Sequence, residues 1–258
     1  MHSKRGVPIL PESGDIAIGI DALPVFQYLG DMFNGTAGNA NMGFNWVSDI
    51  FNSNNIYVQY YLEDKTSVRV GLRLGSQNFI DREFVMKDAP VPYPHITVTD
   101  RMLTSNTNVN LGASYLMHRG KGRVQGYYGA GAMLLWQQTN EKYNYGNAIT
   151  TEFNAPRTTD FGNNITGTGR LLNTSNLTRL GIAAHAFIGV EYFFAPKISV
   201  GGEYAIGFMA LRTTGGQVTE ERWTGTAIEH QTYDMAKDSE ITLDNFNNGA
   251  SIFLKFHF

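Results

Sequence analysis

Six charged residues occupy the polar positions of segments in which every second residue is apolar. Three are acidic and three are basic, so their formal charges cancel. If this polar face lines a poorly hydrated interior, the charges must pair, because an unpaired buried charge is costly. We expect a network of ion pairs that seals an enclosed space, or one that rearranges to gate a narrow path for ions or small solutes. The six residues are Asp21, Arg69, Arg73, Glu191, Glu203 and Lys255.

The histidines give weaker indications of chemistry. His185 and Glu191 share one alternating segment, and a lipid-modifying hydrolase would need a nucleophile beside its base. Position 187, one pleat from His185, is Phe187 rather than serine. We therefore expect His185 to be an interior residue bonded to a neighbour, with no catalytic residue in the chain. We expect His118 at a turn, and no two histidines have the spacing of metal ligands.

Strands must hold the charged residues, and period-two alternation is the strongest pattern in the chain. In Ser67–Gly75, the apolar Val68, Val70, Leu72 and Leu74 share one face, and Arg69 and Arg73 lie on the other. Eight segments alternate in this way and are predicted to be strands. They are Gly14–Leu23, Asn55–Leu62, Ser67–Phe79, Met102–His118, Arg123–Gln138, Leu177–Phe194, Ile198–Arg212 and Asn245–Phe258.

The connections between these segments alternate strictly in length. The short ones are Glu63–Thr66, Arg119–Gly122 and Ala195–Pro196. We expect Thr158–Asn176 to be a mobile linker and Thr213–Asp244 to be a solvated loop. Short turns on one rim and long loops on the other are typical of bacterial outer-membrane barrels. The predicted long loops are Pro24–Asn54, Ile80–Arg101, Thr139–Asn176 and Thr213–Asp244.

Alternation alone does not say which face points inward. A soluble, lipocalin-like barrel keeps its apolar face inside, around a ligand. Here the polar face combines Gly and Ser with paired charges, which suit a narrow interior. The apolar face carries aromatic residues towards both rims, as at the two interfaces of a bilayer. These residues are Tyr60, Tyr115, Tyr192 and Phe256 near the short turns, and Trp136 and Phe208 towards the other rim.

The sequence therefore predicts an all-β fold, an eight-stranded antiparallel up-and-down transmembrane β-barrel with long extracellular loops. We expect residues 1–258 to form a single domain, with residues 1–13 as a periplasmic N-terminal segment. No stretch approaches 18 consecutive apolar residues, so a transmembrane helix is excluded. An exported chain needs a signal peptide, and no apolar segment follows Met1–Gly6, so we expect the numbering to be that of a processed chain.

Composition excludes several other classes of function. The chain has no cysteine, so a disulfide framework or a thiolate metal site is impossible. A net charge of −3 gives no reason to expect a nucleic-acid partner. The 28 glycines, 13 tyrosines and 16 phenylalanines favour strands and turns over helices. We predict no metal and no cofactor.

The C-terminal segment Ile252–Phe258, with alternating apolar residues and a terminal phenylalanine, resembles the assembly signal of outer-membrane barrels. The resemblance implies that Phe256 and Phe258 are read by the barrel assembly machinery during insertion. Lys4–Pro8 followed by Gly14–Asp21 is similar to the start of barrels from Bacteroidota. The whole chain resembles the small OmpA/OmpX-like barrel superfamily, which implies a fold and a location rather than an activity.

We therefore expect a multi-pass protein of the Gram-negative outer membrane with both termini in the periplasm. The favoured function is non-enzymatic: a structural or accessory subunit of an outer-membrane complex, or a surface-binding protein. The expected partners are outer-membrane lipid, lipopolysaccharide and other outer-membrane proteins contacted through the loops. The alternative is a narrow passive channel for ions or small solutes, and a weaker alternative is a lipid-modifying enzyme.

Overall fold

The computed structural model describes residues 6, 8–22 and 56–258, and for residues 21, 164–165 and 244–251 it describes the backbone only. Within this part of the chain, no helix is long and apolar enough to cross a membrane. The strands in the described ranges are β1 (Ile16–Asp21), β2 (Ile56–Glu63), β3 (Thr66–Met86), β4 (Thr97–Arg119), β5 (Val124–Asn144), β6 (Arg157–Thr159), β7 (Asn164–Thr166), β8 (Gly169–Ala195), β9 (Ile198–Thr213), β10 (Gln217–Trp223), β11 (Ile228–Asp234) and β12 (Asp238–His257).

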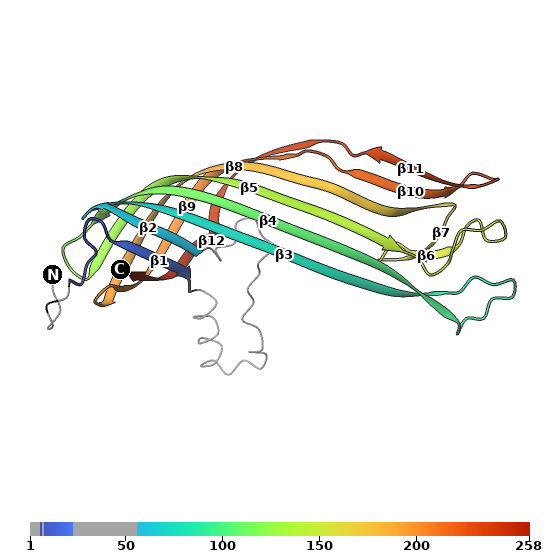
Figure 1. Cartoon of the computed structure of the whole chain (residues 1–258), viewed down its shortest axis with the longest axis horizontal. Helices are drawn as coiled ribbons and strands as arrows, with labels where there is room; N and C mark the ends of the chain where they lie inside the picture. Colours follow the sequence, from blue (N-terminus) through green and yellow to red (C-terminus); the bar gives the residue numbers. More distant parts are fainter. Residues whose placement is uncertain (1–5, 7, 23–55) are drawn as a thin grey trace.

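Eight of the described strands close into a ring. The main sheet has ten strands in the order β11-β10-β8-β5-β4-β3-β2-β1-β12-β9, and an additional pairing joins β8 to β9. The ring therefore runs β1-β2-β3-β4-β5-β8-β9-β12, with every neighbouring pair antiparallel. These are the eight strands that alternation predicts, and each follows its sequence neighbour round the ring (Figure 1).

The three predicted short turns lie together at one end of the ring. Asp64 and Lys65 join β2 to β3, residues 120–123 join β4 to β5, and Pro196 and Lys197 join β8 to β9. Lys197 adopts a positive φ of 62°, which a two-residue turn readily accommodates. The C-terminal residue reaches the same end, because the Phe258 amide donates to the Ile16 carbonyl at 2.7 Å.

Three of the four predicted long loops are wrong, because strands continue through them. The β3–β4 register is unbroken from the Thr66↔Met117 pair to the Met86↔Thr97 pair. The range 139–176 contains the end of β5, the β6–β7 hairpin and the start of β8, and the range 213–244 contains β10, β11 and the start of β12. The fourth predicted loop, Pro24–Asn54, lies outside the described residues.

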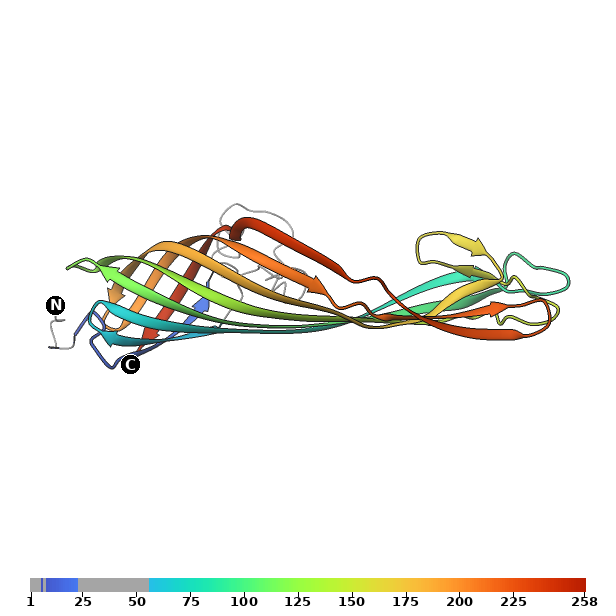
Figure 2. The same cartoon turned by 90° about the horizontal axis from the view of Figure 1, so that it is seen from above.

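These continuing strands form an extension of the sheet beyond the ring, made of residues 75–108, 137–175 and 217–234. Figure 2 shows it as a long, narrow arm with the β6–β7 hairpin near its far end. A backbone ladder needs no apolar side chains, and Thr, Asn, Gln and Tyr occupy much of the arm. Because both faces are largely polar there, the period-two signal fades while the pairing continues.

The predicted mobile linker, Thr158–Asn176, is also wrong. It contains the end of β6, all of β7 and the start of β8. Asp100 of β4 is fully buried and accepts hydrogen bonds from the Thr158 hydroxyl at 2.6 Å and the Thr159 amide at 3.0 Å. Glu83 of β3 accepts a further bond from the Thr159 hydroxyl at 2.6 Å. Two carboxylates of the extension therefore fasten the β6–β7 hairpin.

Replacing Asp100 with Ala should loosen this hairpin without opening the ring. Asp100 also accepts a hydrogen bond from the Gly146 amide at 2.8 Å. The substitution therefore leaves the Thr159 and Gly146 amides without their acceptor. Hydrogen bonds to a charged group contribute about 1.5–3 kcal/mol each. We expect hydrogen-exchange protection at these two amides to fall by at least about tenfold. Asp81→Ala is the control, because the Asp81 carboxylate accepts a bond from the adjacent Arg82 amide instead. Unchanged protection in Asp100→Ala would contradict the assigned role.

Candidate functional site: buried charges inside the ring

An ion pair between Arg69 and Glu203 crosses the inside of the ring. Arg69 lies on β3 and Glu203 on β9, and β3 is the fourth strand from β9 in the order β9-β12-β1-β2-β3. The guanidinium donates two hydrogen bonds to the carboxylate, Nη1 to Oε2 at 2.6 Å and Nη2 to Oε1 at 3.0 Å. The Tyr127 hydroxyl also donates to Oε2 at 3.0 Å. The bidentate geometry fixes the distance between opposite walls.

A second buried pair lies beside the first, nearer the short turns. Lys255 Nζ is 3.1 Å from Glu191 Oε2, and both side chains are at most 1% exposed. Ser199, on the strand between them, donates its hydroxyl to Glu191 Oε1. His257 Nε2 lies 3.3 Å from that carboxylate oxygen and 3.1 Å from Ser199 Oγ. Glu191 therefore contacts a serine, a lysine and a histidine with no access to bulk water.

The structure brings four of the six predicted residues into these two pairs. Arg73 is buried as well, and it lies further along β3 towards the extension, in register with Asn110. The side chain of Asp21 lies outside the described residues, although its backbone pairs with Phe253. That these charges act as one network that seals or gates the ring stays a prediction.

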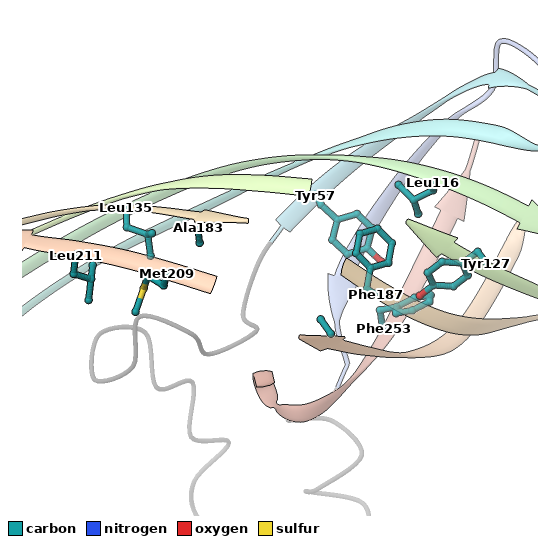
Figure 3. Close-up of a cluster of buried hydrophobic side chains, with 10 residues drawn as sticks. Tyr57, Leu116, Tyr127, Leu135, Ala183, Phe187, Met209, Leu211 and Phe253 are labelled. Carbon is teal, nitrogen blue, oxygen red and sulfur yellow. The ribbon is translucent and has the colours of Figure 1, made fainter. Parts of the chain in front are cut away.

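Aromatic side chains fill the space around the charges. The Arg69 guanidinium lies over the Phe187 ring at 4.6 Å and the Tyr57 ring at 5.3 Å, and Lys255 Nζ lies 4.5 Å from the Phe253 ring centre. Figure 3 shows Tyr57, Tyr127, Phe187 and Phe253 gathered together, apart from Leu135, Ala183, Met209 and Leu211. Cations over aromatic faces are stabilised most when water is excluded.

Each of these four rings lies opposite a glycine on the neighbouring strand. The glycines are register partners of the aromatic residues, and a Cβ added to any of them would lie within 2.6 Å of the opposing ring. Only a residue without a side chain leaves room for the ring to lie flat against the wall. The pairs are Tyr57–Gly19, Tyr127–Gly189, Phe187–Gly129 and Phe253–Gly201.

Sequence reasoning missed most of this inner lining. Tyr57 and Tyr127 were not singled out, although their strand phase is that of the charged residues. The aromatic–glycine pairing depends on register between strands, which one sequence does not supply. The sign that could have pointed to it is the recurrence of glycine on the polar face of the predicted strands.

His118 corrects another prediction, because it is a buried strand residue rather than a turn residue. Its Nε2 lies 2.8 Å from Ser67 Oγ, and the Gln59 amide donates to the same hydroxyl at 2.9 Å. His185 of β8 lies inside the ring, 3.4 Å from Ser114 Oγ of β4, the second strand from β8 in the ring. Ser67 is fully buried, whereas attack on a lipid needs an accessible nucleophile. Among the described residues, no three His, Asp or Glu side chains are placed to hold a metal ion.

Replacing Arg69 with Ala should destabilise the ring strongly. The substitution leaves Glu203 buried without its cation, and breaking a buried pair costs about 3–5 kcal/mol. The expected readout is a lower temperature for the heat-induced mobility shift of the folded chain in gels. Arg179→Ala is the matched control, because the Arg179–Glu240 pair is 37% and 57% exposed and contributes less than about 1 kcal/mol. Equal stability of the two variants would refute a structural role for the crossing pair.

No family model and no curated protein matches this chain. Among solved structures, it is similar to the crystal structure of the outer membrane protein OprG from Pseudomonas aeruginosa. The two chains share 9% sequence identity, the match covers 97% of this chain and 99% of that chain, and the TM-score is 0.37. At this identity and TM-score, the likeness by itself says nothing about what this chain does.

Proposed function

We propose that this chain is an integral outer-membrane β-barrel protein of the OmpA/OmpX-like type, non-enzymatic, whose ring spans the bilayer and whose extension stands outside the cell. The observation that carries the proposal is the apolar outer face of the ring. From Ile56 to Leu62 of β2 the burial alternates strictly, and Ile56, Val58 and Tyr60 face outward with 57%, 45% and 47% of their surface exposed. The outer residues of the other ring strands repeat this pattern.

Such a surface is unsuited to water. Soluble monomers rarely expose a continuous apolar patch larger than a few hundred Å², and here the exposed apolar residues follow every strand of the ring. They include Ile18 on β1, Leu111 on β4, Leu134 on β5, Ile188 on β8 and Phe208 on β9. A hydrocarbon environment accounts for this face. Over the span of β1 and β2, the closed ring also satisfies its backbone groups internally, as a membrane-spanning sheet must.

The inner face argues against the soluble alternative. A lipocalin-like barrel would place its apolar side chains around an internal ligand. This ring instead buries Arg69, Glu203, Glu191 and Lys255 inside and presents most of its aliphatic residues outside. Tyr115 and Tyr192 face outward near the short turns, each 44% exposed, as the aromatic residues of a membrane interface do.

The proposed role is that of a structural or accessory subunit, or a surface-binding protein, with the extension as its working surface. Three features support a closed rather than a conducting ring: the crossing Arg69–Glu203 pair, the Lys255–Glu191 pair and the aromatic packing around both. Lipopolysaccharide and neighbouring outer-membrane proteins are the proposed partners, and the strand ending in Phe256 and Phe258 is the proposed signal for the assembly machinery.

A narrow channel is the second candidate. Beyond the ion pairs, Asn110 of β4 and Arg73 of β3 are buried on the inner wall, beside the apolar Leu135 of β5. Polar side chains on this wall suit the passage of small polar solutes. The two candidates differ in planar bilayers: a sealed ring conducts almost no current until Arg69 is replaced, whereas a channel shows steady single-channel currents in the unmodified protein.

The membrane placement predicts that a charge on the outer face of the ring is far more costly than one on the extension. Ile188 is 64% exposed on β8, between Tyr192 and Leu180, and Ile228 is 45% exposed on β11. In chains refolded into lipid vesicles, Ile188→Lys should lower the free energy of unfolding by about 2–4 kcal/mol. Ile228→Lys, the matched control, should change it by no more than about 0.5 kcal/mol. Equal, small effects in denaturant titrations would count against a bilayer around the ring.

The proposed orientation, with the extension outside the cell, predicts which lysines a protease added from outside can reach. Lys87 follows β3 and Lys237 lies between β11 and β12, both exposed and on the long-connection side, whereas Lys121 lies in the short β4–β5 turn. Trypsin added to intact cells should cut after Lys87 or Lys237 and spare Lys121, as read from fragment masses. Cutting after Lys121 with the other two intact would reverse the proposed orientation.

A further inference from the structure

A cavity of about 450 Å³ lies at the far end of the extension, remote from the buried charges of the ring. Its walls come from the end of β5, the β6–β7 hairpin, the start of β8 and β10. Figure 1 shows where these elements lie in the extension. This volume is within the range of small-molecule binding sites, about 300–1,000 Å³. Neither the ring nor the function proposed above requires the cavity.

The cavity exists because two neighbouring strands part. The β5–β8 pairing ends at Lys142↔Asn173, and beyond this point β8 pairs with β10 as far as Gly169↔Arg222. Tyr143 of β5 and Tyr145, which directly follows the end of that strand, form one wall. The hairpin held by Asp100 and Glu83 contributes another wall.

The walls are fixed before any ligand arrives. Arg170 donates to Glu221 at 2.6 Å and to the Asn147 carbonyl at 2.7 Å, and its guanidinium lies 4.2 Å from the centre of the Tyr145 ring. The Tyr145 hydroxyl donates to the Leu171 carbonyl at 2.6 Å. Burial raises the pKa of Tyr145 to about 12, although Arg170 acts in the opposite direction, so this hydroxyl stays protonated. The Tyr143 and Tyr145 rings are parallel, with centres 6.3 Å apart.

The remaining polar groups of the lining have opposite charges and different hydrogen-bonding roles. Arg222 is 59% exposed and its nearest acid, Glu220, is 3.9 Å away, so its N–H groups have donor capacity left. Asp160 accepts hydrogen bonds from the Gly162 and Asn163 amides through Oδ1, so its Oδ2 lone pairs are available to a ligand. Glu220 accepts a hydrogen bond from the Tyr233 hydroxyl through Oε1, which leaves Oε2 as a further acceptor. The Arg222 guanidinium, which donates, and the Asp160 and Glu220 carboxylates, which accept, therefore line the same cavity.

This combination selects one class of ligand. Sugar hydroxyls both donate and accept, so they satisfy a guanidinium and carboxylates together, and the C–H groups of a sugar ring can pack against tyrosine. A strongly charged ligand would meet a like charge on one wall, and a wholly apolar ligand would desolvate the charged groups without replacing their hydrogen bonds. We propose that this cavity binds a neutral carbohydrate, with Arg222, Asp160 and Glu220 contacting hydroxyls beside the tyrosine wall.

The test uses the purified full chain, folded in mild detergent, on an array of neutral, acidic and amino-sugar glycans. The neutral glycan with the strongest signal is then titrated by calorimetry. Arg222→Ala removes the donor, and Gly169→Leu fills the cavity, since a Cβ at Gly169 meets only ordinary contacts of 3.4 Å or more. Arg101→Ala is the control, because Arg101 is an exposed residue of β4 outside the cavity lining.

We expect neutral glycans to bind, with affinity reduced at least about tenfold in Arg222→Ala and Gly169→Leu and unchanged in Arg101→Ala. Arg222 is exposed, so its replacement leaves the fold intact, and hydrogen exchange at the Thr159 amide verifies this. Absence of glycan binding, a preference for acidic or amino-sugar glycans, or binding that neither variant weakens would overturn the proposal. The binding assay needs no membrane. A negative binding result would therefore leave the proposed membrane placement untouched, and evidence against the membrane placement would leave the proposed glycan site untouched.

Discussion

The rest of the ring depends on the ion pair that Arg69 and Glu203 form across it. An eight-stranded ring has a narrow interior, and two ionised groups taken out of water there are tolerated only if they meet each other with good geometry. The bidentate contact, supported by the Tyr127 hydroxyl, meets that condition. The pair also sets how β3 and β9, on opposite walls of the ring, are aligned along the ring axis. With the charges and an aromatic cluster inside, most aliphatic residues of the ring strands face outward, and this outward apolar face is the basis for the proposed place in a membrane.

Packing around the charges follows one pattern, in which an aromatic ring on one strand lies against a glycine on the next. This pattern has two effects. The aromatic rings fill space in the lumen that ion pairs alone would leave open. The glycines have no side chain, so each leaves room for a ring to lie against the wall, as Tyr127 does over Gly189. Cation–aromatic contacts then join the filling to the charges, since Arg69 lies over Phe187 and Lys255 lies near Phe253. Loss of either partner would affect both the packing and the electrostatics.

Different interactions stabilise the extension. Beyond the ring the sheet is open, so its strands have a solvated face and need no apolar alternation. Carboxylates take over the organising role: the buried Asp100 and the partly buried Glu83 fasten a hairpin whose own hydrogen bonds are few. The same hairpin, with the divergence of β5 from β8, shapes the cavity beside Tyr145. The ring and the extension thus divide the proposed work, one as anchor and the other as recognition surface.

Alternation along the chain was enough to predict eight antiparallel strands, three short turns and the face on which Arg69, Glu191, Glu203 and Lys255 lie. Such features depend on residues close in sequence, where the side-chain period of two is directly visible. The length of the strands could not be predicted, because the extension is polar on both faces and its ladder is made by the backbone. Nor could the partners of each charge, the burial of His118 or the glycine opposite each ring. These depend on register and on which walls of the ring oppose each other, and only closure of the sheet decides that.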